Sequence, residues 1–143
     1  MIYNDKEHIK NISTLLIRNE FGEKLEHFIA EKGTNKNELA NEMSVTHTTV
    51  ERYINGFPPK KSYAIRLCIA LNLTRDETIE LLASAGIVFS KNSNRDIVFD
   101  YIIKNIDFKK ATVTDINILI DNLIEKNQNN YKNKRIIDHI ELI

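Results

Sequence analysis

Apolar residues recur at helical spacing in most of this chain, and short polar or glycine-containing stretches separate the apolar segments. Only four glycines and two prolines interrupt the pattern, so we predict an all-α chain. The predicted helices are Asp5–Arg18, Phe21–Lys32, Lys36–Met43, His47–Asn55, Tyr63–Leu71, Arg75–Ala85, Arg95–Asn105 and Thr112 to about Lys126, and a last apolar stripe follows at Arg135–Ile143.

Polar residues that can cap helices mark most of these starts. Asn35, Thr46 and Ser62 each stand directly before a predicted helix, where a side-chain oxygen can accept a hydrogen bond from a first-turn N–H. Capping-box spacing occurs at three further starts, in the pairs Thr74/Glu77, Ser93/Asp96 and Thr112/Asp115. The Asn- and Lys-rich stretch Lys126–Arg135 has low hydrophobicity, which is typical of a linker.

The two short helices Lys36–Met43 and His47–Asn55 form a pair joined by the tight Ser44-Val45 turn. Each has its apolar residues on one face, and Val45 can fill the gap between them. The residues left on the outer side of the second helix are His47, Thr48, Glu51 and Arg52. A helix pair whose second member presents polar side chains from its first turns is the arrangement that reads base edges in a DNA major groove.

A family resemblance rests on this pair. The matching residues, at matching spacings, are Leu39-Ala40, Val45-Thr46, Val50, and Asn55-Gly56 followed by Pro58-Pro59. With them, the chain from about residue 20 to 85 resembles the helix-turn-helix domain of Cro/CI-type (XRE family) repressors. Ser44 stands where most members have Gly, in a backbone position that is often left-handed, so Ser costs about 1 kcal/mol there or shifts the turn. Ile54 replaces a Glu, which removes one polar contact.

The resemblance implies a five-helix repressor-like domain over about residues 20–86. An N-terminal amphipathic helix within residues 1–19 precedes it, and a C-terminal helical region at 87–143 follows, as a candidate for dimerisation or partner binding. The resemblance also implies base-reading by His47, Thr48 and Arg52, since Arg to guanine is the commonest specific contact. The predicted phosphate contacts are Lys36 and Asn55 from the resemblance, Thr46 and Thr49, and, from charge and position, Lys60 and Lys61.

The net charge is zero, which does not by itself favour DNA binding, because affinity for DNA depends on neutralised phosphates. The distribution of charge is more informative. No acidic residue lies between Glu51 and Asp76, a stretch that contains Arg52, Lys60, Lys61, Arg66 and Arg75. These cations form either a basic patch near the predicted reading helix or ordinary surface charges. Glu51 is expected to accept a hydrogen bond from cytosine N4 or to hold Arg52 in position.

Enzymatic and metal chemistry find little support in the sequence. There is no Gly-rich phosphate loop or HExxH motif, and the four histidines show no metal-ligand spacing. The single cysteine, Cys68, lies at helical spacing with Ala64 and Leu71, so we expect a buried structural thiol. We predict no enzyme activity, cofactor or metal. No apolar run reaches transmembrane length, so we expect a cytoplasmic protein.

Two functions remain. The first is a sequence-specific regulator, most simply a repressor, that binds double-stranded DNA as a homodimer on a two-fold site. The alternative is a protein-interaction module, such as an antitoxin or anti-defence factor, in which the helix-turn-helix is a scaffold and the C-terminal helices bind another protein. Clustering of the basic residues on the face of the 47–55 helix would separate the two. A regulator that senses a small molecule is a third possibility, but no convergent polar set in the C-terminal region supports it.

Overall fold

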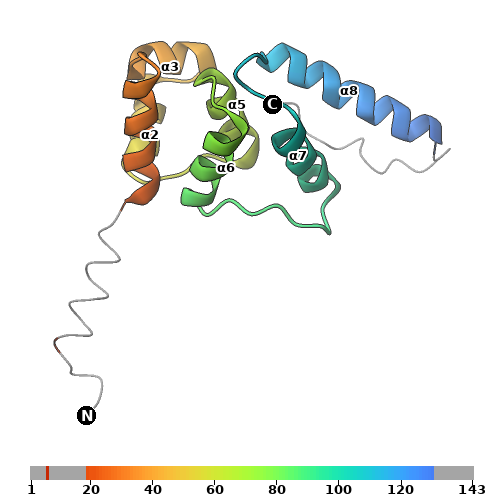
Figure 1. Ribbon diagram of the computed structural model, residues 1–143, viewed down its shortest axis with the longest axis horizontal. Coiled ribbons are helices and arrows are strands. Elements are labelled where there is room, and N and C mark those ends of the chain that lie inside the picture. Colours follow the sequence, from red (N-terminus) through yellow and green to blue (C-terminus); the bar gives the residue numbers. More distant parts are fainter. Residues whose placement is uncertain (1–5, 7–18, 131–143) are drawn as a thin grey trace.

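The computed structural model describes Lys6 and residues 19–130. Seven helices and no strand are found within residues 19–130, which confirms the all-α prediction there. They are α2 (Glu20–Glu31), α3 (Lys36–Met43), α4 (His47–Ile54), α5 (Lys61–Ala70), α6 (Arg75–Ser84), α7 (Asn94–Asn105) and α8 (Val113–Asn130) (Figure 1). The predicted N-terminal helix, apart from Lys6, and the last apolar stripe lie outside the described residues.

Local capping sets most helix starts where the sequence predicts them. Asn35 accepts the Glu38 N–H at 2.9 Å, and Thr46 accepts the Thr49 N–H at 3.2 Å. The box at α6 is complete: the Glu77 N–H donates to the Thr74 hydroxyl at 3.3 Å, and the Thr74 N–H donates back to Glu77 at 2.9 Å. These caps satisfy first-turn N–H groups that no intrahelical carbonyl can reach.

The turn between α3 and α4 keeps the left-handed conformation that glycine usually supplies. Ser44 has φ 57° and ψ 40°, and the Val45 N–H closes the helix end by donating to the Ala40 carbonyl at 3.0 Å. Ser44 therefore carries the expected cost of about 1 kcal/mol rather than shifting the turn. The Arg66 guanidinium on α5 donates to the Met43 carbonyl at 3.1 Å, which ties the end of α3 to the helix beneath it.

Two predicted boundaries are wrong. Ser62 does not cap α5: the helix begins at Lys61, and Lys60 occupies the cap position with no side-chain hydrogen bond. The backbone is extended at Lys60, directly after Pro58-Pro59, and becomes helical at Lys61. Ser62 therefore lies inside the first turn of α5. The predicted linker is helical up to Asn130, because its Lys, Gln and Asn residues include no Gly or Pro to stop α8.

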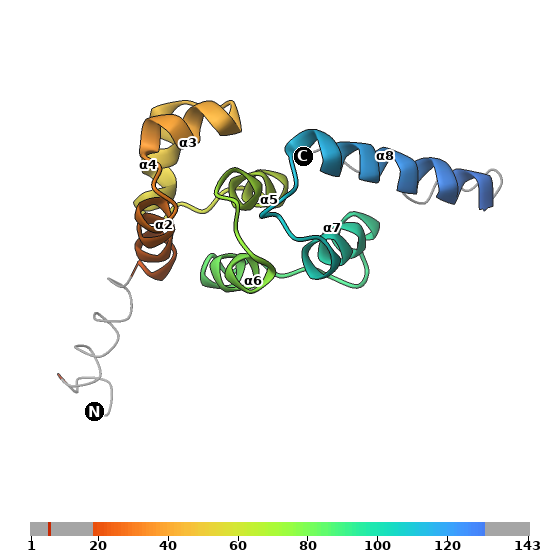
Figure 2. The same cartoon turned by 45° about the horizontal axis from the view of Figure 1, so that its top comes forward.

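The helices share one continuous core. Its fully buried members in the first five helices include Leu25, Leu39, Met43, Val50, Ile65 and Leu81, and those farther along include Phe99, Ile102, Phe108, Ile116 and Ile120. In this core α7 packs on α6 and α8 packs on α5 (Figures 1 and 2). The C-terminal helices thus pack on the two helices that follow the α3–α4 pair. None of the helices described is both long enough and apolar enough to cross a membrane.

A close approach between α2 and α4 orients the helix pair. The Asn19 side chain accepts the Gly22 N–H at 3.0 Å and donates to the Ile54 carbonyl at 2.6 Å. A Cβ atom on Gly22 would overlap that carbonyl, so the absence of a side chain is what lets the end of α4 come this near. Ile54 itself is buried in the core.

Candidate nucleic-acid interface

Helix α4 has one buried side and one exposed side. Val50, Tyr53 and Ile54 are buried against α2 and α3. The predicted base-reading residues His47, Thr48 and Arg52 are all exposed, and their positions fall on one side of the helix. The structure thus brings these three together as one polar surface at the start and middle of α4.

Of the two roles expected for Glu51, the structure does not show the one in which Glu51 holds Arg52. The Glu51 carboxylate instead faces His47, with Oε1 3.6 Å from Nδ1. The Arg52 guanidinium lies over the ring of Phe57, 5.9 Å from its centroid. Glu51 therefore acts on His47, one turn earlier, and Arg52 is positioned by an aromatic ring in the following loop.

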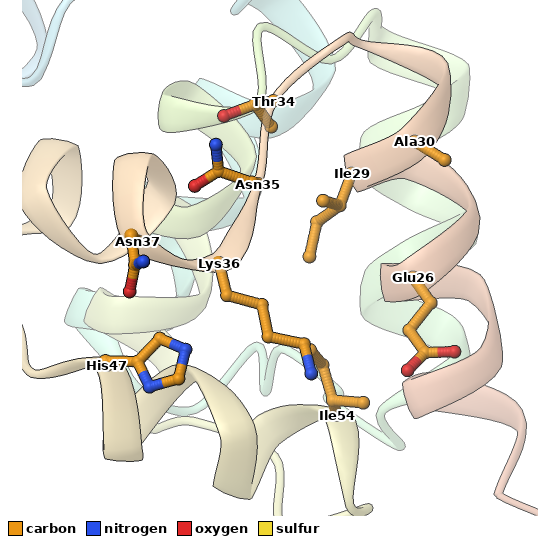
Figure 3. Close-up of a pocket in the computed structure, with 9 residues that line it drawn as sticks. All are labelled: Glu26, Ile29, Ala30, Thr34, Asn35, Lys36, Asn37, His47 and Ile54. Atoms are coloured by element: carbon orange, nitrogen blue, oxygen red, sulfur yellow. The ribbon is translucent and has the colours of Figure 1, made fainter.

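The start of α3 and the start of α4 border a common hollow of about 560 Å³ (Figure 3). The Lys36 side chain extends across this hollow towards Ile54, and the His47 ring faces it from below. Two helix N-termini with their partial positive charge meet here beside Lys36, and the Glu26 carboxylate on α2 lines the same hollow. Lys36, predicted to contact phosphate, and His47, predicted to read a base, thus lie on the same side of the molecule.

The two threonines predicted to contact phosphate are already engaged with each other. The Thr46 and Thr49 hydroxyl oxygens are 2.8 Å apart, and Thr46 also caps α4. A hydroxyl can still accept or donate a further bond, so both can serve the cap and a phosphate. Asn55, the third polar candidate, is exposed at the C-terminal end of α4.

A second hollow, of about 330 Å³, follows α4 on the side of its C-terminal end. Arg52 and Lys60 supply its positive charge, and Phe57 and Tyr63 supply exposed aromatic surface. Pro58 and Pro59 also line it, and Pro59 is buried. Lys60 is exposed, as its predicted role at the phosphate backbone requires.

Lys61 has a different role from the one predicted. Its ammonium group lies 2.7 Å from Asp96 on α7 and 5.6 Å from the centre of the Phe89 ring. The Asp96 side chain is only 3% exposed and also accepts the Ser90 N–H at 2.9 Å. Burial alone would raise the pKa of Asp96, but the hydrogen bonds and charge of Lys61, with the Ser90 N–H, outweigh it and hold that pKa below its usual value.

Only some of the cations that could form a basic patch lie beside α4. Of the five cations between Glu51 and Asp76, Arg52 and Lys60 line the hollow beside α4. Lys61 is bound to Asp96, and Arg66 is bound to the Met43 carbonyl and lies over the Tyr63 ring at 5.1 Å. Arg75 lies on α6 beside Asp76 and Asp107. The positive charge around α4 therefore comes from Lys36, Arg52 and Lys60.

Sequence reasoning missed Asp96 as a partner of Lys61. The Ser93-x-x-Asp96 spacing correctly predicts that Ser93 caps α7, because Ser93 accepts the Asp96 N–H at 3.3 Å. The Asp96 carboxylate, however, turns to a residue 35 positions away. Its neighbours Val98 and Phe99 on an apolar helix are the only local sign that this acid is buried.

Metal binding and the single cysteine are the remaining candidates for chemistry. Within the part of the chain that the structure describes, no group of three or more His, Cys, Asp or Glu side chains is placed to hold a metal ion. Cys68 is buried, as predicted, and burial raises the pKa of its thiol to about 12.

Comparison of this chain with protein-family models, with curated proteins and with solved structures finds no match.

Proposed function

We propose that this protein is a sequence-specific DNA-binding regulator whose α3–α4 pair is a repressor-like helix-turn-helix. The observation that carries the proposal is the two-sided character of α4. Its apolar residues are buried, while His47, Thr48 and Arg52 are exposed beside Lys36 and Lys60. In this proposal α4 lies in the major groove and Arg52 donates to guanine O6 and N7.

The flanking groups supply phosphate contacts. Lys36, at the start of α3, and Lys60, after α4, lie on either side of the reading surface. Asn55 and the α3 N-terminus add neutral donors. One such surface covers too few base pairs to be specific alone, so the protein acts as a dimer with half-sites about 34 Å apart. The C-terminal helices are the candidate dimer contact.

A selection experiment tests the proposal. The purified protein is used to enrich genomic fragments at low and moderate salt, alongside Arg52→Ala and Arg75→Ala. Arg75 is the matched control, because it is an exposed arginine on α6, away from α4. We expect a short inverted repeat. Two lysines per subunit predict that log K falls with log salt with a slope of roughly −4 for a dimer.

Arg52→Ala should lose one guanine preference in each half-site, at a cost of about 1–3 kcal/mol, whereas Arg75→Ala should bind like the unchanged protein. If no fragment is enriched even at low salt, the DNA-binding proposal fails.

A protein-interaction module is the second candidate, and one observation favours it. Ile97 and Tyr101 stand one turn apart on α7 and are 49% and 53% exposed, which is unusual for large apolar side chains on a helix that otherwise packs into the core. An antitoxin or anti-defence factor would use such a surface. Failure of DNA enrichment, together with loss of partner binding in Tyr101→Ala, would support this reading.

A further inference from the structure

The ring of Phe57 is exposed beside Arg52 at the end of α4. Phe57 is 61% exposed, although large apolar residues are ordinarily buried. Its centroid lies 5.9 Å from the guanidinium carbon of Arg52, within the range of a cation–π contact. The arginine predicted to read a base and this ring therefore form one unit on the proposed DNA-facing surface.

The backbone holds the ring in a defined place. The Phe57 N–H donates to the Arg52 carbonyl at 3.0 Å, and the Gly56 N–H donates to the Tyr53 carbonyl at 3.1 Å. With Gly56 at φ +99°, these bonds form the Schellman closure of a helix end. In this motif the residue at the position of Phe57 usually packs on the residue at the position of Arg52. Here a cation–π contact takes the place of the usual apolar one.

The spacing places the ring near a neighbouring base. Successive base pairs are about 3.4 Å apart along DNA, so a ring 5.9 Å from the Arg52 guanidinium lies within about two base steps of a guanine bound by Arg52. Lys60 lines the same hollow, and in the proposed complex it holds the phosphate backbone beside the ring. An apolar ring at this place meets either a base edge or a sugar.

We propose that Phe57 is a specificity-determining residue, and that its ring covers the 5-methyl group of a thymine next to the guanine bound by Arg52. This inference rests on the proposed function. Thymine is the base that presents an apolar group in the major groove, and phenylalanine is among the side chains that contact it. Burying one methyl group corresponds to about fourfold in affinity.

The test removes that methyl group alone. Duplexes of the enriched operator are made with 2′-deoxyuridine in place of each thymine in turn, and Kd is measured for the unchanged protein, Phe57→Ala and Phe57→Leu. Val88→Ala is the matched control, because Val88 is an exposed apolar residue in the segment between α6 and α7. Phe57 is exposed, so its variants should fold, which thermal melting verifies.

We expect uridine to weaken binding by the unchanged protein about fourfold at one thymine per half-site, and about sixteenfold when both half-sites carry it. That thymine should adjoin the guanine whose preference Arg52→Ala removes. Phe57→Ala should bind the thymine and uridine duplexes equally, Phe57→Leu should keep part of the discrimination, and Val88→Ala should keep all of it.

Two results overturn the inference but leave the proposed function standing. In the first, the unchanged protein binds thymine and uridine duplexes equally. In the second, Phe57→Ala weakens binding to every duplex by one common factor, as expected for a sugar contact. If the unchanged protein binds no duplex, the proposed function and this inference both fall.

Discussion

Replacement of Lys61 by Met should destabilise the fold far more than its surface position suggests. Lys61 is 28% exposed, but its ammonium group neutralises an Asp96 carboxylate that is only 3% exposed. Removing one partner of a buried pair costs about 3–5 kcal/mol. Water partly reaches this pair, so we expect Lys61→Met to cost less, about 2–4 kcal/mol. Asp96→Asn should cost less, about 1–2 kcal/mol, because the free ammonium group can turn to solvent.

Lys104→Met is the matched control. Lys104 forms an ion pair with Asp100 at 2.8 Å, nearly the same distance, but its side chain is 64% exposed. Exposed pairs between neighbouring helix turns contribute about 0.3–0.5 kcal/mol. Urea denaturation at pH 7, followed by far-UV circular dichroism, gives the free energy of unfolding for all three variants. The reasoning is refuted if Lys61→Met and Lys104→Met lie within 0.5 kcal/mol of each other, an interval of roughly the error of the method.

Lys61→Met should also reverse the pH dependence of the stability that the Asp96 carboxylate contributes. In the unchanged protein the pKa of Asp96 is lowered, so its contribution is fully present above the unfolded-state pKa of about 3.9 and is lost as pH falls through the folded-state value. Without Lys61, the Ser90 N–H and the Arg95 guanidinium, 3.6 Å from the Asp96 carboxylate, are left to oppose burial, and we expect burial to outweigh them and raise that pKa. The variant should then lose stability as pH rises through the raised value. Denaturation midpoints from pH 3 to pH 7 distinguish the two slopes.

Three further predictions concern single residues. Ser44→Gly should stabilise the protein by about 0.5–1 kcal/mol, because Ser44 is left-handed, with φ 57°; a lower denaturation midpoint would contradict this. Gly22→Ala should destabilise by at least about 2 kcal/mol despite its better helix propensity, because the new Cβ overlaps the Ile54 carbonyl, and an unchanged thermal midpoint would refute that clash. Cys68 should resist alkylation by iodoacetamide in the folded protein and react on unfolding, because burial raises the pKa of its thiol to about 12; labelling in native buffer at the unfolded rate would contradict its burial.

The features that sequence reasoning predicted best depend on near neighbours in the chain. Asn35, Thr46 and Thr74 cap helices because each needs only a backbone N–H three residues away. The family resemblance indicated a left-handed backbone or a shifted turn at Ser44, and the structure has the left-handed one. Burial of Val50 on α4 follows from helical spacing.

The features that it missed depend on residues that are distant in the chain. Lys61 was assigned to the phosphate backbone from its charge and its neighbours, yet its partner Asp96 lies on another helix. The low hydrophobicity of Lys126–Arg135 predicts a linker, but Lys, Gln and Asn extend a helix that is already nucleated, and α8 runs to Asn130. The way α7 and α8 pack on the first five helices likewise follows from tertiary contacts that no local pattern encodes.

The continuous core has a consequence for how this protein can change during evolution. Exchange of one part of a chain for another by recombination requires that each part folds alone. Here Phe99, Phe108 and Ile116 complete the same buried cluster as Leu39 and Val50. A crossover after Gly86 would therefore expose apolar surface on both halves. The two halves must then diverge together, by paired substitutions across their contact.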